Sequence, residues 1–142
     1  MKLQFKLVTN DQELEDAYRI RKIVFVDEQN VPIEEEIDAL ESESTHFLLL
    51  DSENPIGAGR FRTVDNYGKV ERICVLKDSR KGGAGKAIMM GIEEFAKSKG
   101  IKKLKLNAQT QAIPFYSRLG YEVVSEEFLD AGIPHKTMEK YI

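Results

Sequence analysis

The segment from Arg80 to Lys86 limits the fold of this chain more than any other feature, because it places three glycines between an apolar segment and a long helical pattern. The apolar segment runs from residue 70 to 76, and the helical pattern from 84 to 99. This order predicts a strand, a glycine-rich turn and a helix. The first backbone N–H groups of a helix lack intrahelical partners, and the macrodipole adds partial positive charge there. The turn is therefore predicted to bind a phosphate group.

Two common phosphate-binding loops do not fit the spacing of these glycines. A Walker A loop ending in Gly85–Lys86 would have a glycine and a hydroxyl residue where this chain has Arg80 and Ala87. A dinucleotide fingerprint starting at Gly83 would need a third glycine in place of Ile88, and it would lie in a first strand–turn–helix unit. The predicted phosphate ligand is therefore held by a loop of another type.

Composition and charge exclude several classes of protein. Of the 142 residues, 42% are hydrophobic and 32% charged, which is typical of one globular domain over residues 1–142. The net charge of -3 argues against a nucleic-acid-binding surface, and no apolar run approaches the roughly 20 residues that span a bilayer. A single cysteine and an N-terminus without a signal-peptide pattern favour the cytoplasm. The sequence also shows no spacing typical of a metal site.

Hydrophobic periodicity predicts an α/β (or α+β) fold with a mixed, mostly antiparallel central sheet flanked by helices. The predicted strands are 3–7, 46–51, 56–64, 70–76, 103–107, 119–124 and 133–142. Predicted turns lie at Asn54–Pro55 and Tyr67–Gly68, and helices at 84–99 and from a cap at Asn10 or Asp11 to Val24. The strand–helix–strand unit over 70–107 is expected to be parallel and right-handed.

An acidic connector, made of residues 34–36 and 41–43, separates the first helix from the second strand. We expect a short helix or loop here that presents a solvated acidic face. The alternative is an acidic rim that attracts an amine substrate.

Two sequence motifs together resemble the GNAT superfamily of N-acetyltransferases. The first is Arg80-x-x-Gly83-x-Gly85 at the strand-to-helix turn, and the second follows about twenty residues later as 104–109 (LKLNAQ) and 112–121 (AIPFYSRLGY). The resemblance extends over nearly the whole chain and is strongest to the ElaA-like or YjcF-like branch, through residues 21–32, His46, 55–60 and 131–135. One departure is Gln109, which stands where many members have asparagine, while Asn107 lies two positions earlier.

The resemblance implies acetyl-CoA as cofactor, bound in a cleft formed by the parallel strand–helix–strand unit. Main-chain N–H groups of the turn would hold its pyrophosphate, and the preceding strand would contact its pantetheine arm through Ile73 and Val75. Further contacts are implied for Asn107, Ala112 and Tyr116. The turn residues are Arg80, Lys81, Gly82, Gly83, Ala84, Gly85 and Lys86.

Catalytic roles also follow from the resemblance. The backbone N–H of Val75, where the strand of the family often bulges, would polarise the thioester carbonyl, and Tyr116 would protonate or hydrogen-bond the leaving sulfur. The alternative for Tyr116 is a core aromatic residue with a satisfied hydroxyl. Phe115 would then face the core.

Generation of a neutral amine is assigned to Glu71, directly or through water, with His135 or His46 as alternatives. Strand alternation predicts Glu71, Ile73 and Val75 on one face, and Arg72 and Cys74 on the other. Glu71 also has a structural interpretation, as the ion-pair partner of Arg72, Arg60 or Arg62. Cys74 is expected to be a small buried hydrophobe and not a nucleophile.

These features predict transfer of an acetyl group from acetyl-CoA to a primary amine, directly and within a ternary complex. A non-catalytic acyl-CoA-binding or sensing module is the alternative, and a purely structural protein leaves the glycine turn unexplained. Acceptors include a small amine, an aminoglycoside, a peptide N-terminus and a protein lysine, and an exposed terminal strand would allow a homodimer. Candidate residues for the amine pocket are Arg21, Glu28, Gln29, Asp38 and His135.

Overall fold

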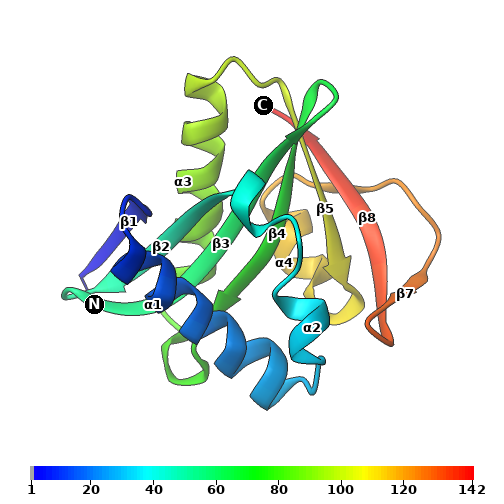
Figure 1. The fold of residues 1–142 in the computed structure, drawn as a ribbon. Coiled ribbons are helices and arrows are strands. Elements are labelled where there is room, and N and C mark those ends of the chain that lie inside the picture. The colour runs from blue at the N-terminus through cyan, green and yellow to red at the C-terminus, as the bar shows by residue number, and fades with distance from the viewer. Residues whose placement is uncertain (1) are drawn as a thin grey trace.

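A computed structural model describes residues 2–142, and its strands form one sheet in the order β1-β2-β3-β4-β5-β8-β6, with β7 paired to β8 (Figure 1). The strands are β1 Leu3–Leu7, β2 Thr45–Asp51, β3 Asn54–Val64, β4 Tyr67–Val75, β5 Lys103–Gln109, β6 Glu122–Val123, β7 Phe128–Asp130 and β8 Ile133–Tyr141. The α-helices are α1 Asp11–Arg21, α2 Ile33–Glu36, α3 Ala84–Ser98 and α4 Ile113–Arg118. Every described strand pair is antiparallel except β4–β5, which confirms the predicted fold class.

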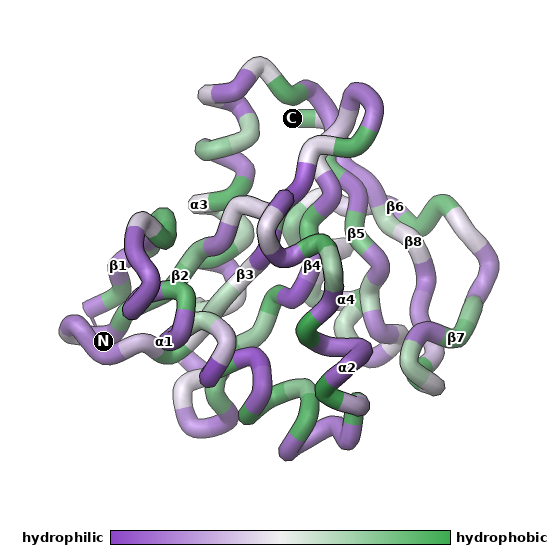
Figure 2. Tube along the Cα trace, viewed as in Figure 1, coloured by the Kyte–Doolittle hydropathy of each residue, from purple (hydrophilic) through white to green (hydrophobic). Residues whose placement is uncertain are grey.

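Helices cover both faces of the sheet, with α1 and α2 on one face and α3 and α4 on the other (Figure 1). The larger hydrophobic cluster lies on the α3 side and includes Phe47, Ile88 and Leu104, and a smaller cluster on the α1 side includes Ile20 and Cys74. Hydrophobic stretches follow the central strands, while the outer loops are mainly hydrophilic (Figure 2). Strands β2, β3 and β4 therefore pack against helices on both faces of the sheet.

The parallel pairing of β4 and β5 is short, and the two strands separate after it. Pairing extends only from Gly68↔Leu104 to Val70↔Leu106, and the C-terminal ends of the strands diverge (Figure 1). Gly68 is needed inside β4, because a Cβ atom there would overlap the Phe61 ring and lie 2.7 Å from Leu104 Cδ2. The turn expected at Tyr67–Gly68 therefore lies earlier, at Asp65, whose φ is 50°.

A β-bulge interrupts β4 where the strands diverge. Arg60 pairs with Glu71 and Ala58 with Cys74, so two residues of β4, Arg72 and Ile73, stand opposite the single residue between Ala58 and Arg60. Arg72 has a φ of 58°, in the left-handed region that non-glycine residues seldom adopt.

The bulge overturns the strand alternation expected from the sequence. Glu71 and Arg72 both form ion pairs on the α2 side of the sheet, where Cys74 also lies. Ile73 and Val75 pack on the α3 side instead. The expected grouping of Glu71 with Ile73 and Val75 is wrong because the extra residue reverses the pleat for the rest of the strand.

Other boundaries differ from the sequence expectations in detail. Asn10 caps α1 by accepting a hydrogen bond from the Glu13 N–H, and the helix continues as a π-helical segment over Lys22–Glu28. Asn54 and Pro55 belong to β3, because the turn lies at Ser52 and Glu53, both with positive φ. The strand expected over 119–124 is reduced to β6, and β7 was not anticipated.

Candidate active site

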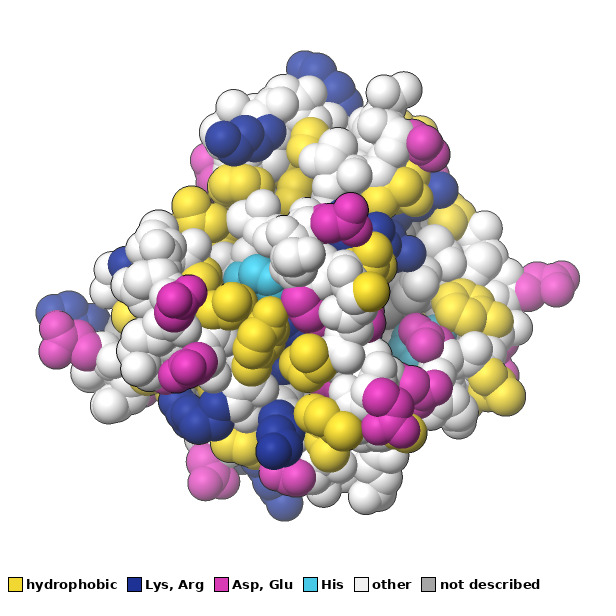
Figure 3. Space-filling model, in the orientation of Figure 1, with side chains coloured by type: hydrophobic (Ala, Val, Ile, Leu, Met, Phe, Trp, Pro, Cys, Tyr) yellow, Lys and Arg dark blue, Asp and Glu magenta, His cyan; other side chains and the backbone are white. Residues whose placement is uncertain are grey.

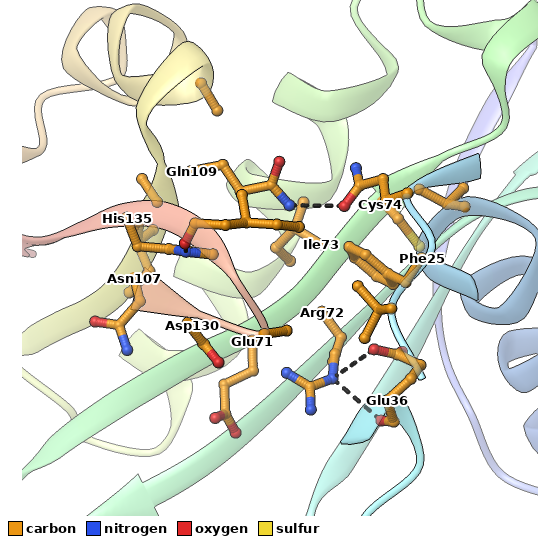
Figure 4. A pocket seen from close by; sticks show the side chains of 18 of the residues that line it. Phe25, Glu36, Glu71, Arg72, Ile73, Cys74, Asn107, Gln109, Asp130 and His135 are labelled. Carbon is orange, nitrogen blue, oxygen red and sulfur yellow. Dashed lines mark hydrogen bonds and ion pairs between the residues drawn. The ribbon is translucent and has the colours of Figure 1, made fainter. Parts of the chain in front are cut away.

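A cleft of about 840 Å³ opens where β4 and β5 separate. One wall comes from β4 and the segment from the π-helical turn to α2, and the other from β5, α4 and the β7–β8 hairpin (Figure 4). Ligands of open α/β sheets bind at such separations of neighbouring strands. Of the residues predicted to form the site, the cleft is lined by Glu71, Ile73, Val75, Arg80, Gly85, Asn107, Ala112 and Tyr116.

Of the residues in the glycine turn, Arg80 and Gly85 line the cleft, whereas Lys81, Gly82, Gly83, Ala84 and Lys86 do not. Gly82 and Gly83 have φ values of 92° and 82°, and no side chain caps the start of α3. The first backbone hydrogen bond of the helix runs from the Ala87 N–H to the Gly83 carbonyl. The N–H groups of residues 84–86 therefore remain available for an anion, which fits the predicted phosphate site.

Arg80 fixes the position of the turn and does not point freely into solvent. Its Nε donates to the Val75 carbonyl at 2.9 Å, and its Nη2 lies 2.7 Å from Glu28 Oε1. The arginine thus ties the glycine turn to the end of β4 and to the π-helical segment. Glu28, which was a candidate for the amine pocket, instead holds the turn.

Gly85 allows α3 and α4 to approach each other closely. A Cβ atom at this position would lie 3.0 Å from Cζ of Phe115, tighter than ordinary van der Waals contact. The Phe115 ring in turn packs edge-on against Tyr116, with 5.0 Å between ring centroids. Close packing at Gly85 therefore sets the position of Tyr116 in the cleft.

Tyr116 places a neutral hydroxyl at the cleft. The residue is 9% exposed. Its pKa is raised above the ordinary tyrosine value, mainly by burial and to a smaller extent by the nearby Cys74. Among residues 2–142 its hydroxyl has no hydrogen-bond partner, although its ring packs in the main core. Cys74 is buried, as expected for a small hydrophobic side chain, and burial raises the pKa of its thiol to about 12.

The β4 bulge places two residues outside the register of the sheet. Arg72 and Ile73 are paired with no residue of β3 or β5. The bulge was expected at Val75, which instead pairs with Gly57. The candidate donors for a substrate carbonyl therefore lie two to three residues before the predicted one.

A buried ion-pair network lies on the α2 side of the sheet, and several of its members line the cleft. Arg21 is fully buried and bonds Glu36 at 2.8 Å and Glu41 at 2.7 Å, while Arg60 contacts Asp38, Glu41 and Glu71 at 2.9–3.0 Å. Arg72 extends the network from the bulge to Glu36 Oε2 at 3.0 Å (Figure 4).

The solvated acidic face expected for the connector is therefore wrong for its central residues. Glu36 and Glu41 are 2% and 9% exposed, because arginines from α1 and β3 neutralise them. Arg21, a candidate for the amine pocket, does not line the cleft. Asp38 does line it, but it is held by Arg60 and Arg72.

Glu71 lines the cleft but is bound by two arginines. Its Oε1 lies 2.7 Å from Arg62 Nε and 3.0 Å from Arg60 Nη2. Burial alone would raise the pKa of Glu71, but the hydrogen bonds and charges of Arg62 and Arg60 outweigh burial and leave the pKa below its ordinary value. The structural interpretation of Glu71 as an ion-pair partner is confirmed for Arg60 and Arg62.

The opposite wall carries polar side chains of β5 and β8. Asn107 Oδ1 accepts a hydrogen bond from Thr137 Oγ1 at 2.8 Å, and Gln109 Nε2 donates to Gln29 Oε1 at 2.8 Å. The buried residues Leu106 and Ala108 alternate with them and face α3. Gln29 and Gln109 therefore form an amide bridge between the two walls of the cleft.

The two histidines occupy different places. His135 lies at the start of β8 and lines the cleft, with its Nδ1 2.6 Å from the Ile133 carbonyl oxygen. His46 does not line the cleft, and its Nε2 donates to the Glu41 carbonyl at 2.9 Å. Of the two alternatives considered for proton transfer, the structure brings His135 to the site.

Carboxylates without ion-pair partners among residues 2–142 line the cleft. They are Glu34 and Glu35 on α2 and Asp130 on β7, and all three are exposed. Acidic side chains gather over α2 on the face shown in Figure 3. The charge at this opening favours a cation over an anion.

A family model described as an acetyltransferase (GNAT) domain matches residues 11–142. The chain belongs to the GNAT acetyltransferase family. It is 56% identical over 135 residues to YjcF, an uncharacterized N-acetyltransferase of Bacillus subtilis strain 168, covering 94% of this chain and 96% of the relative. Escherichia coli ElaA has a similar fold, with a TM-score of 0.85, 24% identity and coverage of 97% of this chain and 99% of ElaA. A GNAT acetyltransferase from Elizabethkingia anophelis with acetyl-CoA bound has a TM-score of 0.77 at 14% identity, with 99% of each chain covered.

As a member of this family, the protein is an acyltransferase, and its reaction uses an acyl-CoA. The resemblance inferred from the two sequence motifs is confirmed. Over residues 2–142, no helix has both the length and the apolar character needed to cross a membrane.

Several residues of the acetyltransferase site were not anticipated from its sequence. They include Phe25 and Gln111 at the cleft wall, the cleft-lining Asp130, and the bulge residue Arg72 as a link to α2. A short polar turn before 133–142 was the only sequence signal for Asp130. The positions of the others depend on pairings between distant segments, such as the bond from Gln109 to Gln29.

Proposed function

We propose that this acetyltransferase moves the acetyl group of acetyl-CoA to a primary amine by direct transfer while both substrates are bound, with residues 1–142 acting as one domain. The observation that carries the proposal is one cleft lined by both Gly85, at the uncapped start of α3, and Tyr116. An anion site and a proton donor in one cleft match the needs of transfer from a phosphorylated thioester.

Acetyl-CoA is the acetyl donor, as expected for this family, and it supplies the activated acyl group. The positive φ angles at Gly82 and Gly83 and the open space around Gly83 leave room for a phosphate at the turn. In the proposal, residues 80–86 hold the pyrophosphate, Ile73 and Val75 contact the pantetheine arm, and Asn107 and Ala112 add further contacts.

The chemistry requires a polarised carbonyl and a protonated leaving sulfur. We assign the first task to the backbone N–H groups of the bulge residues Arg72 and Ile73, since donors fixed by a bulge need no reorganisation. Tyr116 gives a proton to the departing sulfur, because its raised pKa keeps the hydroxyl protonated. Glu71 lines the same cleft, but its carboxylate is paired with Arg60 and Arg62.

The acceptor is a primary amine carried by a small molecule, an aminoglycoside, a peptide N-terminus or a protein lysine. The exposed carboxylates Glu34, Glu35 and Asp130 would attract such a cation to the cleft. Two chains could also pair through an exposed edge strand such as β1 to form a homodimer.

Isothermal titration calorimetry with acetyl-CoA tests the donor site, with ATP, NAD and a pantetheine lacking pyrophosphate as controls. Selective binding of acetyl-CoA supports the proposal, and a screen of primary amines for release of free CoA thiol then tests transfer. Binding of a control nucleotide in place of acetyl-CoA would contradict it.

Direct transfer is tested separately by steady-state kinetics and intact-protein mass spectrometry. Intersecting initial-rate patterns and no acetylated protein are expected, because the thiol of Cys74 is buried and protonated. Parallel lines with a trapped acyl-enzyme would exclude the ternary mechanism.

The rival function is a non-catalytic acyl-CoA sensor. The pairing of Glu71 with two arginines favours it, because this leaves the carboxylate a weak base. Any amine-dependent turnover that requires Tyr116 eliminates it.

A further inference from the structure

The arginine pairs of Glu71 leave open which group removes the proton from the ammonium acceptor. We propose that His135 is the catalytic base and accepts this proton at Nε2, an inference that rests on the proposed amine transfer. The tautomer of the ring, its place in the cleft and the ion pairs of the competing carboxylates support this assignment.

The hydrogen bond of Nδ1 determines the tautomer of His135. Nδ1 lies 2.6 Å from the carbonyl oxygen of Ile133, which can only accept a hydrogen bond. Nδ1 must therefore carry the proton of the neutral ring, and Nε2 must carry the lone pair. Nε2 has no hydrogen-bond partner among residues 2–142, although the residue is only 8% exposed.

Packing holds the imidazole in this orientation. The ring stacks on Phe128 of β7 with 6.0 Å between centroids and 23° between planes. The Ile133 carbonyl lies two residues earlier at the tight end of the β7–β8 hairpin, so both contacts come from one rigid unit. A base held by packing and by a bond to its other nitrogen is positioned for proton transfer.

The sheet register puts His135 on the acceptor side of the cleft. His135 stands opposite Gln109 on β5, and the buried Ala108 faces α3 on the other side. Figure 4 shows His135, Gln109 and Asn107 on one wall and the bulge residues Arg72 and Ile73 on the other. Tyr116 projects from α4, which lies on the α3 face of the sheet (Figure 1). The base and the acid thus approach the bulge from opposite faces.

The other candidates for the base are less suitable. Glu71 is bound by two arginines, which lower its pKa and weaken it as a base. His46 lies outside the cleft. Asp130 lines the cleft, but it is exposed, and a solvated carboxylate is a weak base at pH 7. Charged and titratable side chains that line the same cleft are Glu34, Glu35, Glu36, Asp38, Arg60, Lys69, Glu71, Arg72, Cys74, Arg80, Tyr116 and Asp130.

The proposed step conserves protons and bonds. Nε2 of His135 takes one proton from the ammonium, and the neutral amine then forms a C–N bond with the thioester carbonyl carbon. As the C–S bond breaks, Tyr116 gives its proton to the sulfur, and the second proton lost by the nitrogen restores the tyrosine through water. The products are the amide, free CoA thiol and one proton, which His135 releases to solvent.

The test compares His135→Asn with wild type, using benzylamine and hydroxylamine as acceptor probes at pH 7. Asparagine can still donate to the Ile133 carbonyl from the position of Nδ1, but it lacks a basic nitrogen. We expect kcat/KM for benzylamine, which is an ammonium ion at this pH, to fall about 100-fold or more. For hydroxylamine, which is already largely neutral, kcat/KM should stay close to wild type.

Two further readouts separate a base from a structural residue. In His135→Asn only the amine fraction that is already neutral can react, so kcat/KM for benzylamine should rise steeply from pH 7 to pH 9 towards the wild-type value. Glu127→Gln, an exposed control on the same hairpin segment outside the cleft, should match wild type at every pH. Two-bond ¹H–¹⁵N correlation spectra should show the Nδ1–H tautomer, and acetyl-CoA affinity by calorimetry should not change.

Three results would overturn the role of His135. They are an Nε2–H tautomer, equal losses for both amines, or wild-type rates for benzylamine at every pH in His135→Asn with the large loss in Glu71→Gln instead. If wild type binds acetyl-CoA but acetylates neither probe nor any amine of the screen, the proposed function itself fails. Normal turnover in His135→Asn contradicts only the base assignment.

Discussion

At the scale of single residues, Tyr116 combines a packed ring with an unpartnered hydroxyl. Its aromatic neighbours Phe115 and Tyr121 lie with ring centroids 5.0 and 6.0 Å away, so removal of one oxygen atom should leave the packing intact. We therefore expect Tyr116→Phe to lower kcat by about 100-fold, the usual size of a general-acid contribution, with unchanged affinity for acetyl-CoA. Initial rates and calorimetry measure the two quantities, and an unchanged kcat would remove the acid role.

Cys74 gives a second prediction at the same scale. With its pKa at about 12 and its side chain buried, the thiol carries almost no thiolate at pH 8. We expect iodoacetamide to leave the native protein unlabelled and fully active, and to label it rapidly once urea unfolds it. Mass spectrometry follows the modification, and rapid labelling of the folded protein would show that the strand opens near Cys74.

At the scale of elements, local features were predictable and pairings between distant segments were not. The glycine turn and α3 follow from residues adjacent in sequence, so their positions agree with expectation within a residue. The bulge at Arg72 depends on the register between β3 and β4, which strand alternation alone cannot reveal. Glu36 and Glu41 were expected in solvent because their partner, Arg21, lies 15 and 20 residues away.

Two glycines of the turn are expected to respond differently to substitution. Gly83→Ala meets no atom within 4 Å but must adopt a φ of 82°, so it should cost about 1–2 kcal/mol of stability. Gly85→Val would drive its side chain into the Phe115 ring and displace α4 from the donor site. We expect it to weaken acetyl-CoA binding about tenfold or more, equivalent to ~1.4 kcal/mol. Thermal unfolding measures the stability of both variants, and calorimetry measures their affinity for acetyl-CoA. If Gly85→Val binds acetyl-CoA as tightly as wild type, the proposed donor site is contradicted.

At the scale of the whole molecule, buried ion pairs connect α1, the acidic connector and the central strands. Arg21→Met removes a guanidinium that neutralises Glu36 and Glu41, leaving each of these buried carboxylates with one arginine partner, Arg72 or Arg60. We expect the free energy of unfolding to fall by about 3–5 kcal/mol. Arg19→Met on the same helix is the control, because Arg19 is exposed and its contact with Asp16 is 3.6 Å, so about 0–1 kcal/mol is expected. Urea denaturation measures the free energy of unfolding of both variants. Equal, small losses would show that the buried ion pairs of Arg21 contribute no more to stability than a surface ion pair.

The same network makes stability depend on pH in a defined direction. Burial opposes ionisation of Asp38, Glu41 and Glu71, but their arginine partners outweigh it and lower all three pKa values, whereas burial raises the pKa of Glu36. A carboxylate with a lowered folded-state pKa stabilises the fold above its unfolded pKa and loses that contribution as pH falls through the folded value. Since three groups act this way against one, the urea midpoint should decline as pH drops below about 4.5, the ordinary glutamate value. A midpoint that stays level from pH 5 to pH 3 would show that these carboxylates are not ionised in the folded protein.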